Sequence, residues 1–128
     1  MKRPSPEHAA QKMVVQLLRL MRLDFVAPLN GAHLAGSPAR RAMQWRKLEG
    51  LGAGKGIPDI LIFTPPPAFP DARGVAVEMK SPDGKAPTSE QLGWHRRLEA
   101  IGWVVILAYG FDEARRDLRA CGYERRAS

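Results

Sequence analysis

Val75-Ala76-Val77-Glu78-Met79-Lys80 is an apolar run that ends in two charged side chains. Successive side chains of a β-strand point to opposite faces, so Glu78 and Lys80 are predicted to project from the same face. A Val/Ala-rich run is typical of an interior strand, where an unpaired charge is costly. The two charges therefore indicate a functional site, although a Glu two residues before a Lys also occurs in solvated stripes on exposed strands.

A second apolar run, residues 60–63, begins directly after Pro58-Asp59. The segment between the two runs, residues 64–74, carries four prolines and a glycine, which favours a turn and antiparallel pairing of the two strands. The start of one strand would then face the end of the other. We therefore expect Asp59 to lie beside Glu78, although an Asp that follows a Pro is also common in ordinary turns.

Two adjacent carboxylates repel each other unless a cation lies between them. A cation in that position lowers both pKa values and keeps both groups ionised. An all-oxygen site with few protein ligands suits Mg²⁺ or Mn²⁺. Together with the ammonium group of Lys80, such a site predicts hydrolysis of phosphodiester bonds.

The composition favours a nucleic-acid partner. The chain has 128 residues, which we expect to form one domain over residues 1–128, and 20 Lys and Arg against 13 Asp and Glu give a net charge of +7. Cys121 is the sole cysteine, so an internal disulfide is excluded and a cytoplasmic location is expected. No apolar run approaches about 18 residues, so neither a membrane span nor a membrane partner is expected.

Helix and strand signals alternate along the chain. A Ser5 N-cap followed by Pro6 begins a helix that is expected to end at Leu23. The other expected elements are a short strand over 24–29, a turn at Asn30-Gly31, a basic helix over 40–51, paired strands over 60–63 and 75–80, a helix over 89–101, a buried strand over 103–109 and a helix over 112–120. This order predicts an α/β fold in which helices flank a mixed sheet.

The combined motifs resemble those of a known family. Gly56-Ile57-Pro58-Asp59, Glu78-Met79-Lys80 and the downstream Gln91 are similar to the motifs of the PD-(D/E)xK nuclease superfamily, and the compact layout resembles its VRR-Nuc branch. The resemblance extends from Glu7 to about Ala114. It implies a restriction-endonuclease-like three-layer core, formed here by a single VRR-Nuc-like nuclease domain.

The resemblance also implies roles for individual residues. Asp59 and Glu78 would be metal ligands, joined by the backbone carbonyl of Met79. Lys80 would orient or help to deprotonate the attacking water and would offset charge at the phosphate. Gln91 would lie beside the active site, although Thr88-x-x-Gln91 also fits a helix capping box.

Glu7 matches a first-helix glutamate that joins the metal site in related resolvase-type nucleases. An acidic residue in the first turn is also what the helix dipole favours, so both interpretations of Glu7 stand.

Other polar residues give weaker signals. The histidines and Cys121 lack zinc-ligand spacing, and His95, on the Gln91 face of its helix, could contact substrate but fits an ordinary packing or surface position better. The glycines of residues 50–56 do not form a phosphate-binding P-loop and are expected to permit close approach of a substrate backbone. Candidate contacts to nucleic-acid phosphates are Arg40, Arg41, Arg46, Lys47, Lys55, Lys85, Arg96 and Arg97, although any single one of them fits an ordinary solvated charge better.

The sequence thus predicts a Mg²⁺- or Mn²⁺-dependent DNA endonuclease of phage or bacterial DNA metabolism, such as DNA repair. The resemblance implies a homodimer, whose paired sites can cut opposite strands of a branched DNA. Branched DNA, including Holliday junctions, is our preferred substrate and does not follow from the sequence. The alternative is a non-catalytic nucleic-acid-binding module on a nuclease scaffold. An RNA-recognition protein is disfavoured, because the aromatic-rich strand of an RNA-recognition sheet is absent from the sequence.

Overall fold

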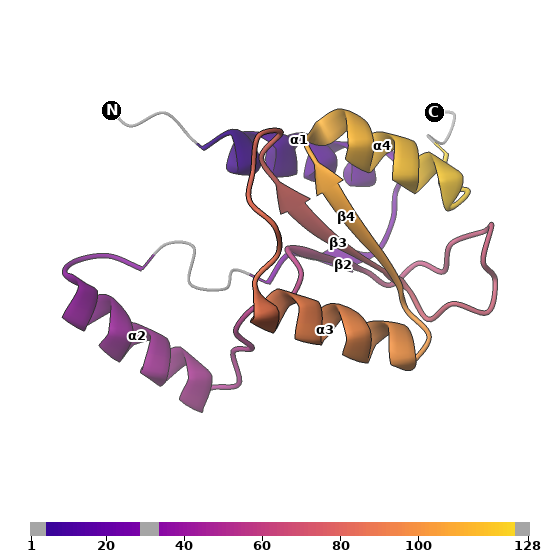
Figure 1. The fold of residues 1–128 in the computed structure, drawn as a ribbon. Coiled ribbons are helices and arrows are strands. Elements are labelled where there is room, and N and C mark those ends of the chain that lie inside the picture. The colour runs from indigo at the N-terminus through magenta and orange to yellow at the C-terminus, as the bar shows by residue number, and fades with distance from the viewer. Residues whose placement is uncertain (1–4, 29–33, 125–128) are drawn as a thin grey trace.

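The computed structural model describes residues 5–28 and 34–124 of the chain (Figure 1). In chain order the elements are α1 (Pro6–Leu20), β1 (Phe25–Val26), α2 (Pro38–Gly50), β2 (Ile60–Ile62), β3 (Val75–Lys80), α3 (Ser89–Ala100), β4 (Val104–Tyr109) and α4 (Phe111–Ala120). The expected order of helices and strands is confirmed.

The sheet is mixed, with the strand order β1-β2-β3-β4. Strand β2 pairs antiparallel with β3, with Ile60 opposite Val77, whereas β4 pairs parallel with β3, with Val104 opposite Val75. Strand β3 is therefore an interior strand. Its first five residues are buried and only Lys80 at its end is partly exposed, so both faces of β3 are covered.

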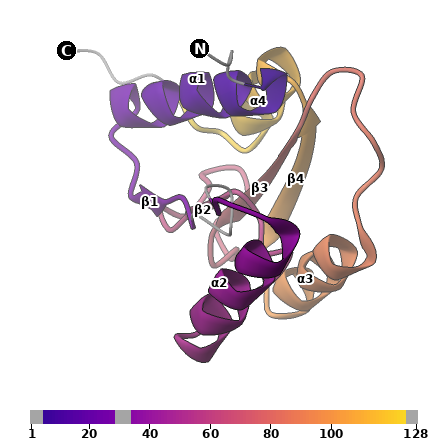
Figure 2. The ribbon, with the colours of Figure 1, turned by 90° about the vertical axis from the view of Figure 1, so that its left-hand side faces the viewer.

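Helices cover the sheet on both faces. Figures 1 and 2 show α1 and α4 on one face and α3 on the other, which gives three layers. Leu18 of α1 and Leu118 of α4 are fully buried against the sheet residues Ile60 and Ile62 in one apolar cluster. Burial of an aliphatic side chain of this size stabilises the fold by about 1.5–3 kcal/mol, so this cluster supplies much of the stability.

Helix α2 stands apart from these layers (Figure 1). None of its residues is buried, although Trp45 and Leu48 are partly covered. Met43 is 62% exposed, and Leu51, which caps the end of the helix, is 79% exposed. The N-cap is Ser37, whose hydroxyl accepts a hydrogen bond from the N–H of Arg40 at 3.2 Å. The helix therefore begins at Pro38, two residues before the expected start.

The first helix ends earlier than expected. Helix α1 stops at Leu20, because Arg22 adopts the left-handed conformation with φ of 58° and the chain turns back toward the sheet. The expected strand over 24–29 is reduced to Phe25–Val26, and the predicted turn at Asn30-Gly31 lies outside the described residues. Among residues 5–28 and 34–124, no helix has the length and apolar character needed to cross a membrane.

Candidate active site

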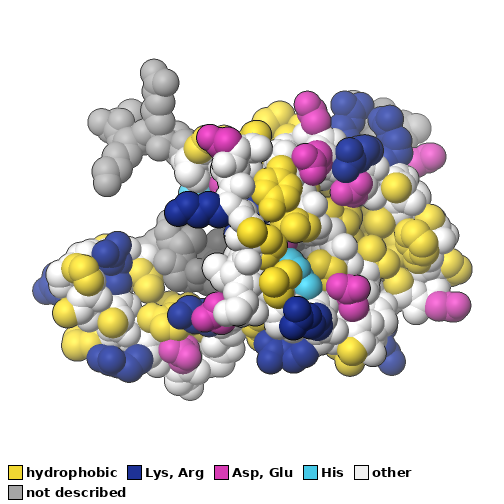
Figure 3. Space-filling view, in the orientation of Figure 1, with side chains coloured by type: hydrophobic (Ala, Val, Ile, Leu, Met, Phe, Trp, Pro, Cys, Tyr) yellow, Lys and Arg dark blue, Asp and Glu magenta, His cyan; other side chains and the backbone are white. Residues whose placement is uncertain are grey.

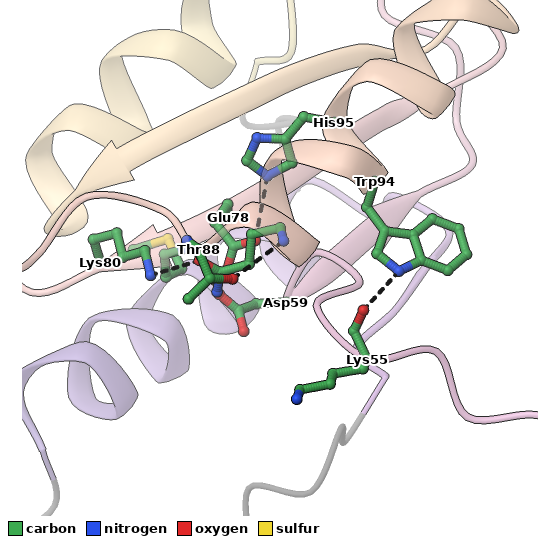
Figure 4. A network of polar contacts seen from close by, with 9 residues as sticks. Lys55, Asp59, Glu78, Lys80, Thr88, Trp94 and His95 are labelled. Carbon is green, nitrogen blue, oxygen red and sulfur yellow. Dashed lines mark hydrogen bonds and ion pairs between the residues drawn. The ribbon is translucent and has the colours of Figure 1, made fainter. Parts of the chain in front are cut away.

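Asp59 and Glu78 lie side by side, as the strand pairing predicts. Ile60 of β2 is opposite Val77 of β3, and the same register, continued by one residue, sets Asp59 against Glu78. The Oδ2 atom of Asp59 accepts a hydrogen bond of 2.7 Å from the backbone N–H of Met79. This bond fixes the Asp59 carboxylate at the end of β3 (Figure 4).

The Glu78 carboxyl group is held through both of its oxygens. Glu78 is only 1% exposed. Oε2 accepts a hydrogen bond of 3.4 Å from Nε2 of Gln91, and Oε1 lies 3.3 Å from Nε2 of His95 (Figure 4). Gln91 and His95 are four residues apart on α3, so they occupy the same face of that helix. Helix α3 therefore presents two polar side chains to one buried carboxyl group.

Gln91 forms the expected capping box and also contacts two of the other candidate site residues. Its Oε1 atom accepts a hydrogen bond of 2.9 Å from the backbone N–H of Thr88, and the Thr88 hydroxyl accepts one of 3.2 Å from the N–H of Gln91. These two bonds form a capping box at the start of α3. The same Oε1 atom also accepts a bond of 2.9 Å from Nζ of Lys80. One side chain therefore anchors the helix and contacts Lys80 and Glu78.

The close approach of the two carboxyl groups changes the protonation of Glu78. Burial, followed by the charge and hydrogen bond of Asp59, raises the pKa of Glu78 to about 9, and the charge of Lys80 opposes this only in part. In the absence of a cation, Glu78 is therefore protonated at neutral pH. A hard divalent cation would reverse this preference, because it favours the ionised form.

The donor set fits such a cation. The two carboxyl groups supply only oxygen, and each carboxylate oxygen can accept a second interaction beyond the bonds to Met79, Gln91 and His95. Within residues 5–28 and 34–124, no three His, Cys, Asp or Glu side chains gather closely enough to hold a metal by themselves. A set of two carboxylates suits Mg²⁺, which usually retains several waters.

Glu7 approaches the same carboxylates from α1. Partial burial and the charge of Asp59 raise the pKa of Glu7, while Lys80 and His8 act in the opposite direction. Glu7 and Lys80 also line a pocket of about 400 Å³, together with Ser81, Asp83, Gly84 and Lys85. A second pocket, of about 480 Å³, lies between α1 and α4. The first pocket brings Glu7, Lys80 and Lys85 to one place.

The glycine-rich segment before Pro58 packs closely on α3. The Nε1–H of Trp94 donates a hydrogen bond of 2.9 Å to the backbone carbonyl of Lys55. A Cβ atom on Gly56 would lie 2.8 Å from the backbone carbonyl carbon of Glu90, and the φ of Gly56 is +84°, so only glycine fits there. These glycines thus allow the segment to approach α3 closely, which guides the chain to Asp59, whereas the expected approach to a substrate backbone stays a prediction.

The candidate phosphate contacts fall into three groups. Four are exposed on α2, namely Arg40, Arg41, Arg46 and Lys47 (lower left in Figure 3). Lys85 lines the pocket beside Lys80. The remaining three lie on or against α3: Lys55 pairs with Glu90 at 3.8 Å, Arg97 stacks on Trp94 at 4.3 Å from the ring centre, and Arg96 is exposed.

His95 is the site residue that sequence reasoning missed. The interpretation of His95 as an ordinary packing or surface residue overlooks its contact with Glu78. Burial lowers the pKa of its imidazole, which favours the neutral form. The available signal was its spacing of four residues from Gln91, which places both on one helical face.

The layered mixed sheet and its flanking helices define an α/β fold of the restriction-endonuclease-like type. No protein-family model and no curated protein sequence matches the chain. Among solved structures, the chain is similar to one named "VRR_NUC domain protein", with a TM-score of 0.64 and 20% sequence identity. The match covers 93% of this chain and 89% of the other. The expected fold, that of a VRR-Nuc domain, is therefore confirmed.

Proposed function

We propose that the chain is a metal-dependent DNA endonuclease of the VRR-Nuc type, which hydrolyses phosphodiester bonds. One observation carries the proposal. Asp59, Glu78 and Lys80 meet at the end of an interior strand, where the carboxyl groups of Asp59 and Glu78 lie close enough for each to affect the ionisation of the other. The likeness of the fold to that of a VRR_NUC domain protein supports the nuclease class.

Asp59, Glu78 and the backbone carbonyl of Met79 would hold Mg²⁺ or Mn²⁺. Glu7 interacts electrostatically with both carboxyl groups from α1, but it would have to move closer to them to become a further ligand. The raised pKa of Glu78 supports this assignment, because burying two adjacent carboxyl groups without a cation is unfavourable. When bound, such an ion lowers the pKa of a water molecule and offsets the negative charge that grows on the phosphate.

Lys80 would act at the phosphate. Its side chain projects from the same strand face as Glu78, and its Nζ atom is held by Gln91 at 2.9 Å. Only one of its three N–H donors is used in that bond. The remaining donors can orient an attacking water and contact a phosphate oxygen, where the positive charge offsets the charge of the transition state.

The substrate would be held by cations around this site. The net charge of +7 favours DNA, and four of the candidate contacts are exposed on α2. Lys85 lines the pocket beside Lys80 and would contact phosphates near the scissile bond, with Arg96 farther along α3. Lys55 contributes less, because its charge is partly offset by Glu90.

A homodimer that acts on branched DNA is the preferred form of this proposal. Two sites related by a two-fold axis could cut opposite strands of a four-way junction, as implied by the resemblance to resolvase-type nucleases. We further propose that the protein acts in the cytoplasm of a bacterial or phage-infected cell, since its sole cysteine, Cys121, is a free thiol.

The test is cleavage of labelled four-way junctions, flaps and linear duplexes in Mg²⁺, in Mn²⁺ and in EDTA. We expect metal-dependent cleavage that is fastest on branched DNA and that is reduced at least 100-fold by Lys80→Ala, as is typical when a group that stabilises transition-state charge is removed. Equal rates on the three substrates would overturn the preference for branched DNA. Tight binding with no cleavage in either metal would favour the non-catalytic binding module.

A further inference from the structure

A buried histidine contacts the carboxyl group at the centre of the candidate site. His95 is 7% exposed, and its Nε2 atom lies 3.3 Å from Oε1 of Glu78 (Figure 4). Histidines are rarely buried without a hydrogen-bond partner, and this one lies against a carboxyl group that is itself 1% exposed. The contact is therefore a built part of the interior and not a chance approach of surface groups.

The contact belongs to a two-point clamp. Gln91 binds Oε2 of Glu78 at 3.4 Å, and His95 lies on Oε1, so each carboxyl oxygen has its own partner. Both partners come from α3, which is fixed at its start by the Thr88 capping box and farther along by the buried Leu98. A carboxyl group held at both oxygens by one helix has little freedom to rotate about its terminal bond.

We propose that His95 is a positioning residue that sets the orientation of the Glu78 carboxylate for metal binding. The inference rests on the proposed function, in which Glu78 is a metal ligand. A carboxylate that holds a cation has no proton to donate, so the imidazole must donate its Nε2–H to Oε1. His95 would occupy one lone pair of Oε1 and leave the second to the metal.

The expected size of the effect follows from other metal sites. Hydrogen bonds that orient ligating groups are worth roughly 10–100-fold in metal affinity or activity. Loss of the His95 donor would leave Oε1 of a buried carboxylate without its partner, which favours a rotated side chain. Affinity for DNA should change little, because His95 is buried beneath the site and the candidate phosphate contacts lie elsewhere.

The experiment compares three variants of the full chain. His95→Leu replaces the imidazole by an apolar side chain of similar bulk and so removes the Nε2–H donor. His95→Gln restores an amide N–H that can reach Oε1. Leu98→Ala is the matched control, because it removes a buried contact from the same helix, one turn away, without touching Glu78. Thermal unfolding of all three shows how far each one loosens α3.

The main measurement is the affinity for Mn²⁺ in the absence of DNA. The concentration of free Mn²⁺ is determined by electron paramagnetic resonance. We expect His95→Leu to weaken Mn²⁺ binding by roughly 10–100-fold, with His95→Gln within about fivefold of the parent chain and Leu98→Ala unchanged. Cleavage at saturating Mn²⁺ should show a lower kcat for His95→Leu with an unchanged KM for DNA. DNA affinity in Ca²⁺ should be the same for all.

Three results would overturn the inference. The first is that His95→Leu binds Mn²⁺ as tightly as the parent chain. The second is that Leu98→Ala loses as much Mn²⁺ affinity as His95→Leu, and the third is that the parent chain binds no Mn²⁺. The proposed function is tested separately by the same preparations. A parent chain that binds Mn²⁺ with the expected pattern of variants but cuts no DNA would contradict the nuclease proposal and would leave the positioning role of His95 intact.

Discussion

Lys80 and Gln91 are joined by a hydrogen bond of 2.9 Å between Nζ and Oε1, which ties the end of strand β3 to the first turn of helix α3. The same oxygen accepts the backbone N–H of Thr88 at 2.9 Å. The capping of a helix and the placement of a candidate catalytic lysine therefore depend on one atom. Variants at Thr88 and Gln91 can separate the two roles.

We predict that Gln91→Ala lowers both stability and cleavage, whereas Thr88→Ala lowers stability alone. Each change breaks the capping box and should cost about 1 kcal/mol of the free energy of unfolding. Only Gln91→Ala also frees Lys80 and one oxygen of Glu78. Urea denaturation and initial rates of DNA cleavage measure the two effects. A Thr88→Ala variant that loses as much activity as Gln91→Ala would show that the amide acts only through the helix cap.

Much of the site could be predicted because it depends on local geometry. The two-residue period of a strand puts Glu78 and Lys80 on one face, and a turn-rich connection puts Asp59 at the facing strand end. The helix that contains Gln91 could be predicted from the cap at Thr88. The signal Ser37-Pro38 at the start of α2 has the same form as Ser5-Pro6, so the true start of α2 was also available from the sequence.

Other features depend on tertiary structure and could not be predicted. The spacing from Gln91 places His95 on the Gln91 face of α3, but its burial against Glu78 depends on the packing of α3 over β3, which the spacing does not show. Arg22 takes a left-handed conformation that ends α1, although nothing in its residue type favours such a turn. Helix α2 has no buried residue, although Ala42, Trp45 and Leu48 are spaced for one helical face.

The stability of the metal-free protein should fall as the pH rises. The pKa of Glu78 is about 9 in the folded chain, against about 4.3 for an unfolded glutamate. Between these values the folded state binds one more proton than the unfolded state, so the free energy of unfolding decreases by up to about 1.4 kcal/mol per pH unit. Urea denaturation in EDTA at pH 5, 7 and 9 measures this slope.

Glu78→Gln should remove the greater part of that pH dependence and stabilise the metal-free protein at pH 8, because the amide keeps a neutral group in the same space. Glu49→Gln, which alters an exposed carboxylate on α2, is the control and should leave the slope as it is. An unchanged slope in Glu78→Gln would show that the buried carboxyl group is not the source of the pH dependence.

Divalent metal should raise the melting temperature more at pH 8 than at pH 6. A bound cation favours the ionised form of Glu78, so binding releases a proton and becomes stronger as the pH rises. Stabilisation by a bound ligand grows with its concentration relative to the dissociation constant. Thermal unfolding with and without Mg²⁺ or Mn²⁺ at the two pH values measures the difference.

Asp59→Asn should abolish the metal-induced rise in melting temperature, because it removes one of the two charges that attract the cation. Asp71→Asn is the matched control, since Asp71 is exposed in the loop between β2 and β3. An equal rise in melting temperature in Asp59→Asn would place the metal elsewhere on the protein.

Neutralising the exposed cations of α2 should weaken DNA binding without changing the chemical step. We predict that replacing Arg41, Arg46 and Lys47 by Gln lowers the affinity for duplex DNA and reduces the slope of log affinity against log salt by about 0.9 for each phosphate that the helix no longer neutralises. The kcat at saturating DNA should stay close to that of the parent chain, because α2 lies to the side of the sheet whose strands β2 and β3 bring Asp59 and Glu78 together (Figure 1).

The matched control removes the same charge from another helix. Arg115, Arg116 and Arg119 are exposed on α4, which packs beside α1 on the sheet face opposite α3 (Figure 1). A general electrostatic attraction would weaken equally in both triple variants, since each has three fewer positive charges than the parent chain. Direct binding of DNA by α2 would lower affinity and salt slope only in the α2 variant. Equal decreases in the two variants would therefore rule out α2 as a specific DNA-binding element, whereas a decrease confined to the α2 variant would locate part of the DNA-binding surface on a helix that has no buried residues.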